Sequence, residues 1–234
     1  MEQLHNGFIL ELCDGAFPLS TDSIALSGFA RLPKNARVLD LGSGCGTLGL
    51  LLCAKDPGCH VTGIEINAAA HRTAFRNAEQ NNIADRLVSI CGDIGSISAL
   101  LPPGGFSVCI SNPPYFSSGP QSKTVPLARR DDLCCMDTLM SAAAHALQYG
   151  GNFYLVHRPE RLAELCVRAC NHKLEPKRLQ LLRHRSDGPV ALVLVQCRKG
   201  GKPGLIWEEE SLFHPDGSPT AYYRKLYHLQ EVTP

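Results

Sequence analysis

A regular alternation of short apolar runs with longer helical patterns begins at residue 37 and constrains the fold more than any other feature of this chain. Residues 37–41 and 60–66 are apolar runs of strand length, and each precedes a segment, 47–55 or 68–81, whose apolar residues recur at helical spacing. The alternation continues with strands at 87–91, 106–111 and 152–157 and with helices near 133–148 and 161–171. Strands separated in this way pair in parallel, because each helix returns the chain to the same edge of the sheet.

The C-terminal part departs from this alternation. Residues 179–185 and 190–198 are two strand patterns joined by the turn sequence Ser186-Asp187-Gly188-Pro189, which predicts an antiparallel pair. We therefore expect an α/β fold, a Rossmann-like doubly wound and mostly parallel seven-stranded sheet with an antiparallel C-terminal edge hairpin.

The length predicts one domain, because 234 residues suffice for one sizeable core and are too few for two. We expect a single domain over 1–234, made of an N-terminal extension 1–36, a core 37–198 and a C-terminal extension 199–234. The N-terminal extension contains a helix start capped by Ser20, and residues 222–227 are typical of an amphipathic closing helix.

Composition excludes several classes of protein. The eleven cysteines are an odd number, and their spacing lacks the clustered pairs of a zinc site. The first residues carry acids in place of a signal peptide, and no apolar run approaches the ~20 residues that cross a bilayer. We expect a cytoplasmic protein with reduced cysteines, no metal and no membrane association.

Charge is unevenly distributed along the chain. Residues 158–202 hold eleven Lys or Arg against four acids, a net charge of +7 in a chain whose total is +1. A basic stretch of this kind attracts a polyanion such as RNA, or else forms an ordinary solvated face. The sequence leaves both interpretations open.

A glycine-rich turn follows the first predicted strand. The segment from Asp40 through Gly42, Gly44 and Gly46 to Thr47 lies where a parallel strand ends and a helix begins, the edge at which such sheets bind ligands. Glycines let the backbone approach a ligand closely, and the helix N-terminus offers free N–H donors. Thr47 stands where a dinucleotide-binding turn has its third glycine. Asp40 would repel a pyrophosphate, but it suits the ammonium and sulfonium groups of S-adenosylmethionine.

Two further acids follow the next strands in register. Glu65 closes the second strand 19 residues after Gly46, where its carboxylate can bind both ribose hydroxyls of a cofactor. Asp93 follows the third strand, where it can accept a hydrogen bond from an adenine amino group. The three acids in register predict S-adenosylmethionine as the cofactor.

The sequence Asn112-Pro113-Pro114-Tyr115 follows the fourth strand, at the same edge as the glycine turn. The prolines fix an extended turn in which the Asn112 side chain and the Pro113 carbonyl can converge on one spot. Two acceptors there suit an amino group, because hydrogen bonds from both N–H groups pull a conjugated nitrogen toward a nucleophilic geometry without a strong general base. Tyr115 would stack on the planar group. The predicted catalytic residues are Asn112, Pro113, Pro114 and Tyr115, and the predicted reaction is methylation of an exocyclic or amide nitrogen.

These motifs resemble those of the amino-methyltransferases of DNA, RNA and protein glutamine. More narrowly, the chain resembles the bacterial tRNA(Val) adenine-N6 methyltransferase family over residues 17–23, 39–46, 93–94, 111–116, 128–131, 156–161 and a basic closing strand that ends at 199–201. The resemblance implies that residues 17–23 flank the cofactor and that Arg129 and Arg130 contact RNA. It departs from the family at Asp131, where the usual residue is Glu. The cofactor contacts predicted from the motifs and the resemblance together are Thr21, Asp40, Gly42, Ser43, Gly44, Cys45, Gly46, Glu65, Ile66, Asp93, Ile94 and Asn112.

An adenine N6 in tRNA is the predicted acceptor, and several alternatives stay open. A protein glutamine N5-methyltransferase also holds a planar nitrogen, but those enzymes usually carry an extra N-terminal helical domain, for which about 36 residues are too few. Guanine N2 or another RNA base is an alternative, because the motif binds the amine and says little about the ring. A non-catalytic cofactor-binding RNA module is the alternative from a different class. The sequence does not specify the oligomeric state.

Overall fold

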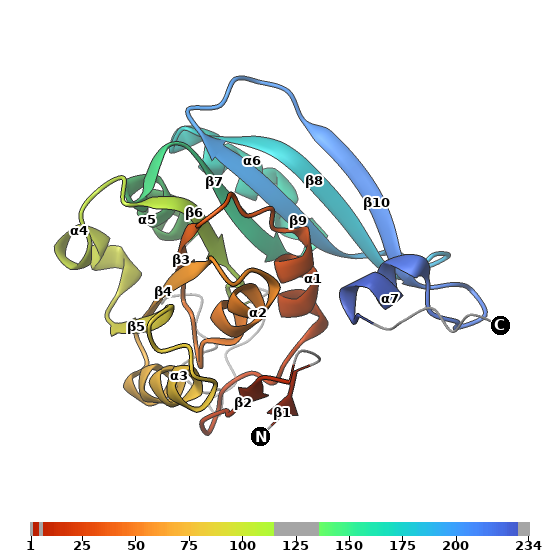
Figure 1. The fold of residues 1–234 in the computed structure, drawn as a ribbon. Helices are drawn as coiled ribbons and strands as arrows, with labels where there is room; N and C mark the ends of the chain where they lie inside the picture. Colours follow the sequence, from red (N-terminus) through yellow and green to blue (C-terminus); the bar gives the residue numbers. More distant parts are fainter. Residues whose placement is uncertain (1, 5–6, 115–135, 229–234) are drawn as a thin grey trace, which may run out of the picture.

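An eight-stranded sheet forms the centre of the structure, a computed structural model that describes residues 2–4, 7–114 and 136–228 (Figure 1). Its strand order is β10-β8-β9-β7-β6-β3-β4-β5. The five parallel strands are β3 (Arg37–Leu41), β4 (His60–Glu65), β5 (Leu87–Cys91), β6 (Phe106–Ser111) and β7 (Leu147–His157). The predicted doubly wound, mostly parallel α/β arrangement is therefore confirmed.

Helices cover both faces of the sheet (Figure 1). One layer holds α1 (Thr21–Phe29), α2 (Thr47–Lys55) and α3 (Ala68–Gln80), and the other holds α4 (Ile97–Leu100), α5 (Met136–Ala146) and α6 (Leu162–Asn171). Successive side chains of one strand enter opposite layers: Val38 packs in the first cluster and Leu39 in the second. Because both faces are covered, the central strands are continuous apolar runs in the sequence.

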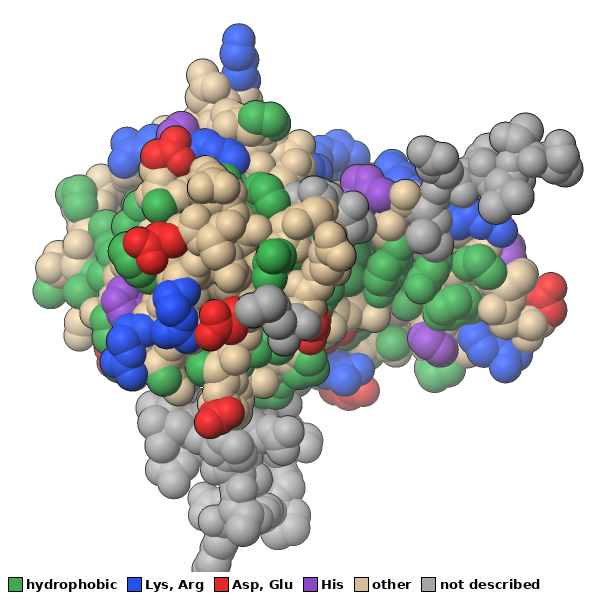
Figure 2. All heavy atoms as spheres, turned by 60° about the horizontal axis from the view of Figure 1, so that its bottom comes forward, with side chains coloured by type: hydrophobic (Ala, Val, Ile, Leu, Met, Phe, Trp, Pro, Cys, Tyr) green, Lys and Arg blue, Asp and Glu red, His purple; other side chains and the backbone are tan. Residues whose placement is uncertain are grey.

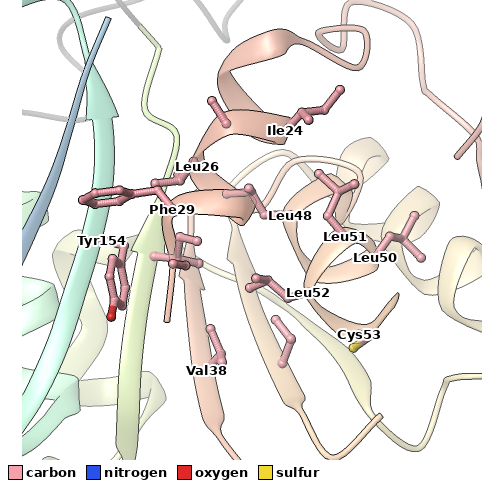
Figure 3. Packing of buried hydrophobic residues seen from close by; sticks show 14 of the residues in the cluster. Ile24, Leu26, Phe29, Val38, Leu48, Leu50, Leu51, Leu52, Cys53 and Tyr154 are labelled. Carbon is pink, nitrogen blue, oxygen red and sulfur yellow. The ribbon is translucent and has the colours of Figure 1, made fainter. Parts of the chain in front are cut away.

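The apolar side chains of helix α1 pack against one face of the sheet. Leu26 of α1 and the leucines of α2 gather over Val38 of β3 (Figure 3). Phe29, at the end of α1, meets Tyr154 of β7 edge-on with the ring centroids 6.0 Å apart (Figure 3). Full burial of a leucine or phenylalanine side chain stabilises the folded state by roughly 1.5–3 kcal/mol. At the other end of the helix, the Ser20 hydroxyl accepts a hydrogen bond from the Ser23 amide at 3.3 Å, which confirms the predicted cap.

The sheet has eight strands instead of the predicted seven, because β10 (Ile206–Phe213) pairs in parallel with β8 (Leu174–Arg185). The predicted antiparallel hairpin is present as β8 and β9 (Val190–Lys199). However, β9 lies between β7 and β8, and β10 covers the outer side of β8, so the hairpin is not the edge of the sheet. Three consecutive glutamates occupy the middle of β10, and without an apolar alternation the segment gave no strand signal.

The C-terminal helix α7 (Ala221–Leu226) packs against β10 and α1 (Figure 1). The rings of Phe213, Tyr223 and Tyr227 follow one another: Phe213 meets Tyr223 in a tilted arrangement with centroids 4.8 Å apart, and Tyr223 stacks on Tyr227 with centroids 4.4 Å apart. The Tyr227 hydroxyl lies 3.3 Å from the Thr21 hydroxyl at the start of α1. This aromatic column attaches the outer strand to the N-terminal end of α1.

A small two-stranded sheet, β1 (Glu2–Gln3) and β2 (Ile9–Leu10), lies beside α3. Two asparagine side chains, Asn77 in α3 and Asn81 at its C-terminal cap, bind the backbone of residues 9 and 11. Asn81 donates to the Ile9 carbonyl at 2.7 Å and accepts from the Ile9 N–H at 2.8 Å. Asn77 makes the same pair of bonds with Glu11 at 2.9 and 2.8 Å.

Across the described ranges, every helix is too short or too polar to span a bilayer. The nine cysteines of this part of the chain are free thiols, and no group of three or more potential metal ligands occurs within it.

Candidate functional site

The strand order reverses between β3 and β6, and this point defines the candidate site. From β3 the chain winds outward through β4 to β5, whereas from β6 it winds the other way to β7. Connections leaving in opposite directions open a crevice at the carboxyl ends of the two strands, where open α/β sheets bind ligands. The glycine turn follows β3 and Asn112 follows β6, so the two predicted motifs meet at this crevice.

The glycine turn has a backbone that other residues adopt only with strain. Gly42, Gly44 and Gly46 have φ angles of 76°, 56° and 83°. A Cβ built on Gly42 or Gly44 would meet no atom within 4 Å, so the turn faces open space at these residues. Gly46 is the N-cap of α2 and makes no side-chain capping bond. The turn therefore offers an accessible backbone surface next to the N–H groups of a helix N-terminus.

Asp40 is buried at the base of this turn without a partner. Its side chain is 1% exposed, and neither carboxylate oxygen has a hydrogen-bond partner among the described residues. Burial, and secondarily the charge of Glu65, raises the pKa of Asp40 from 3.8 to about 8. A bound cation next to Asp40 would lower this pKa again, because an opposite charge favours the ionised form of a carboxyl group.

Unsatisfied polar atoms concentrate at the turn. Four buried side-chain nitrogen or oxygen atoms lack a partner in the described part of the chain, and three of them are the two Asp40 oxygens and the Ser43 hydroxyl. Buried polar groups are otherwise almost always hydrogen-bonded, so such atoms indicate a ligand or water that the protein is built to receive. The fourth atom belongs to Arg178, on a different part of the sheet.

Both carboxylate oxygens of Glu65 are held by backbone N–H groups, one from the glycine turn after β3 and one from the loop after β4. One carboxylate oxygen accepts from the Gly44 N–H at 2.7 Å and the other accepts from the Asn67 N–H at 2.7 Å. These bonds fix the carboxylate plane while leaving further lone pairs for hydroxyl donors. The next residue, Ile66, is an apolar side chain with 48% of its surface exposed, which suits it to cover a flat ring.

Asp93 lies at the carboxyl end of the neighbouring strand β5. It is exposed, and one oxygen accepts from the Gly95 N–H at 2.8 Å, which caps a short 3₁₀ turn, Ile94–Ser96. Ile94, the other predicted contact here, is buried and packs in the second core cluster. Thr21, a further predicted contact, is the first residue of α1, and its hydroxyl lies 3.3 Å from the Tyr227 hydroxyl.

Asn112 is half-buried at the end of β6, and Pro113 beside it is buried. The Asn112 amide nitrogen donates to the Ser23 hydroxyl at 3.0 Å. This bond joins residues 89 positions apart and holds the Asn112 side chain against α1. Tyr115, Arg129, Arg130 and Asp131 lie outside the described residues.

Three residues that support the site were not singled out from the sequence. Ser23 was included only as part of the helix start, and it orients Asn112. Asn77 is fully buried on α3 and donates to the carbonyl of Cys45 in the glycine turn at 2.8 Å, in addition to its bonds to Glu11. Gly63 of β4 lies beneath the turn, where a Cβ would come within 2.5 Å of the Ser43 hydroxyl. A polar residue inside an apolar helix face is the signal that could have identified Asn77.

The basic stretch identified in the sequence is partly neutralised in the fold. Arg178 and Arg183 form salt bridges with Glu208 and Glu209 of β10, at 3.7 and 3.4 Å. Positive and negative side chains are interspersed on the face that Figure 2 presents. On the carboxyl edge of the sheet, a cavity of about 120 Å³ is lined by Thr21 and Asp22 of α1 and by basic side chains that include Arg158 and Arg183.

The described residues fit S-adenosylmethionine. A cationic ligand resting on the turn would give Asp40 its missing counter-charge, the exposed glycine backbone allows close contact, and Glu65 can accept from a pair of hydroxyls. A dinucleotide would instead bring a pyrophosphate toward the buried Asp40 carboxylate, and the repulsion between the negative charges is unfavourable.

Comparison with known proteins leads to the same chemistry. Residues 25–169 match the family model of the methyltransferase small domain. A protein named tRNA1(Val) (adenine(37)-N6)-methyltransferase from Photobacterium profundum is 26% identical over 212 residues, which cover 89% of this chain and 88% of the relative. A protein of the same name from Vibrio parahaemolyticus is 31% identical, and the match covers 94% of this chain and 91% of the relative.

Two solved structures share the fold. The crystal structure of a predicted O-methyltransferase from Agrobacterium tumefaciens matches with a TM-score of 0.75 at 21% identity, covering 89% of this chain and 96% of that one. Geranyl diphosphate C-methyltransferase from Streptomyces coelicolor, solved with S-adenosyl-L-homocysteine, matches with a TM-score of 0.57 at 13% identity, covering 76% and 78%.

Proposed function

This chain belongs to the methyltransferase small-domain family, and from that premise we propose that it methylates the N6 amino group of an adenine in tRNA. It is an S-adenosylmethionine-dependent methyltransferase. The observation that carries the choice of acceptor is the similarity over about nine-tenths of its length to proteins named tRNA1(Val) (adenine(37)-N6)-methyltransferase. The Asn-Pro-Pro-Tyr sequence beside the glycine turn supports a planar amine as the acceptor.

The cofactor supplies an electrophilic methyl group on a sulfonium. On the chain's side, the Asp40 carboxylate would provide the negative charge for the cationic part of the cofactor, and Glu65 would accept from the two ribose hydroxyls. Asp93 and the exposed Ile66 would bind the edge and the face of the adenine ring. The contacts that hold Glu65 and Asp40 in place are backbone and packing contacts, so these groups are preorganised before the ligand arrives.

The acceptor nitrogen would be oriented by two oxygens at the end of β6. The Asn112 side-chain oxygen and the Pro113 carbonyl would each accept one N–H of the adenine amine, which directs the nitrogen lone pair toward the cofactor. Ser23 holds the other end of the Asn112 amide at 3.0 Å. Because the methylated nitrogen is strongly acidic, its extra proton can leave to solvent, and a dedicated base is not required. Much of the rate would come from this positioning.

An unpaired nucleotide is the expected target, because its base can enter the crevice and stack without first breaking a duplex. Tyr115, which directly follows Pro114 in the sequence, would stack on that base with roughly 1–3 kcal/mol. Arg158 and Arg183, at the small cavity on the carboxyl edge, are suited to backbone phosphates of the same RNA.

The test is to incubate the protein with labelled S-adenosylmethionine and separate pools of tRNA, ribosomal RNA and release factor, followed by digestion and mass identification of the product. Label in N6-methyladenosine from tRNA is expected. Label only in protein would contradict an RNA substrate, label in another base would contradict adenine N6, and no label at all would favour a binding module.

Two variants sharpen this experiment. Asn112→Ala is expected to reduce kcat by about 100-fold or more while leaving cofactor affinity within twofold, since the lost contact acts on the acceptor. Asn171→Ala is the matched control, because Asn171 is exposed at the end of α6. Equal activity of the two variants would contradict the role of Asn112.

A further inference from the structure

A second cavity lies at the amino-terminal edge of the sheet, opposite the methyl-transfer crevice. Its volume is about 410 Å³, within the range of small-molecule sites. It is lined by Arg31 in the segment between α1 and β3, by Asn152 and Tyr154 of β7, and by Arg178 and Gln196 on the β8–β9 hairpin. None of these residues belongs to the site described above.

Arg178 is held in this cavity by packing more than by charge. Its guanidinium carbon lies 4.4 Å from the centre of the Phe29 ring, and Tyr154 supports that ring edge-on (Figure 3). Its acceptors are all distant: the Gln196 side-chain oxygen at 3.3 Å, the Phe29 carbonyl at 3.5 Å and the Glu208 carboxylate at 3.7 Å. Its Nε–H is the fourth buried polar atom without a partner in the described part of the chain. A guanidinium with five donors is therefore rigidly placed and incompletely satisfied.

The cavity also carries an excess of positive charge. Arg31 lines it, and its side chain forms no hydrogen bond or ion pair with the described residues. Burial, followed by the positive charge of Arg31, lowers the pKa of Arg178, as expected where two guanidinium groups lie close together. Glu208 is the one carboxylate in an ion pair with either arginine within the described residues. Arg31 and Arg178 thus carry two positive charges against the single, distant carboxylate of Glu208, and this imbalance favours the binding of an anion in the cavity.

Neutral donors complete the lining. Gln196 accepts from Arg178 with its oxygen, and its amide nitrogen donates to the Asn152 oxygen at 3.0 Å. This relay occupies the Asn152 oxygen, so the Asn152 amide nitrogen is the end of that side chain that can donate to a ligand. We propose that this cavity is a second binding site, which holds a phosphate group between Arg31, Arg178 and Asn152.

Isothermal titration of the full-length protein with inorganic phosphate, against chloride at equal ionic strength, tests the site without any methyl transfer. Saturable binding is expected for the wild type. Arg31→Ala should weaken it by about tenfold or more, because a charge-assisted hydrogen bond is lost. Asn152→Asp should abolish it, since it keeps the acceptor for Gln196 and replaces the donor by a negative oxygen. Lys34→Ala, which removes an equal charge from an exposed residue outside the cavity, should change it less than twofold.

The phosphate can come from RNA or from a small molecule, and tRNA binding at several salt concentrations distinguishes the two sources. If the site holds a backbone phosphate, Arg31→Ala lowers tRNA affinity and reduces the slope of log K against log salt by about one, whereas Lys34→Ala does not. If the ligand is a free phosphate compound, tRNA affinity is unchanged while phosphate binding is lost. Adenosylhomocysteine binding should be retained by every variant, which verifies that the variants are folded.

Two results would overturn the proposal. One is the absence of phosphate binding to the wild type together with identical tRNA affinities of Arg31→Ala and Lys34→Ala. The other is an equal loss of phosphate binding in both variants, which would assign the effect to general surface charge.

Discussion

Replacing Asp40 by asparagine should stabilise the ligand-free protein and weaken cofactor binding. The carboxyl group is buried with no hydrogen-bond partner among residues 2–4, 7–114 and 136–228, and its pKa is raised from 3.8 to about 8 in the folded state. Below pH 3.8 the folded and unfolded states both hold the proton, so ionisation contributes no difference. Between pH 3.8 and 8 only the unfolded state ionises, and folding stability is therefore lost as the pH rises.

The magnitude follows from about 1.4 kcal/mol for each unit of pKa difference. The pKa of Asp40 is 3.8 in the unfolded state and about 8 in the folded state. Relative to low pH, the free energy of unfolding of the wild type therefore falls by about 2 kcal/mol at pH 5, about 4 kcal/mol at pH 7 and about 6 kcal/mol at pH 9. Asparagine has nearly the same shape and does not titrate, so Asp40→Asn should be more stable than the wild type by these amounts. A difference of this size is a large fraction of the stability of an ordinary domain.

Urea unfolding of both proteins at the three pH values measures this difference. Glu79→Gln is the control, because Glu79 is exposed on α3 and its neutralisation should change stability by less than about 0.5 kcal/mol at every pH. A pH-independent difference, or an Asp40→Asn variant less stable than the wild type at pH 7, would refute the reasoning. Calorimetry completes the test: adenosylhomocysteine should release close to one proton on binding the wild type at pH 7, and the variant should bind more weakly without this release.

Two other substitutions probe residues that support the site. Ser23→Ala removes the hydroxyl that receives the Asn112 amide at 3.0 Å, so kcat should fall by about tenfold with cofactor affinity unchanged; a rise in KM for the cofactor alone would contradict this role. Asn77→Ala removes a buried hydrogen bond to the Cys45 carbonyl and part-buried bonds to Glu11, and should destabilise the protein by about 2–4 kcal/mol in chemical unfolding. Its cofactor affinity should also fall, and an unchanged affinity would show that the glycine turn holds its conformation without Asn77.

The fold could be predicted where periodicity is strong. The strands β3, β4, β5 and β6 and the helices between them were found close to their observed bounds, because apolar runs of strand length alternate there with segments of helical periodicity. β10 could not be found, since its three central glutamates interrupt any apolar alternation and its partner β8 is not adjacent to it in sequence. β10 pairs with the outer edge of β8, and Arg178 and Arg183 of β8 form salt bridges with its glutamates.

The candidate site, like the fold, could be predicted from the sequence only in part. The sequence by itself determined that a glycine turn, three acids and Asn112 would follow successive strands, because a parallel sheet brings the carboxyl ends of its strands to one edge. Only the tertiary structure decided that Asp40 is buried with no hydrogen-bond partner in the described part of the chain, that Ser23 contacts Asn112, and that Arg31 and Arg178 share a cavity at the other edge. The reason is physical: periodicity depends on neighbours along the chain, whereas desolvation and unpaired charge depend on atoms that distant segments bring together.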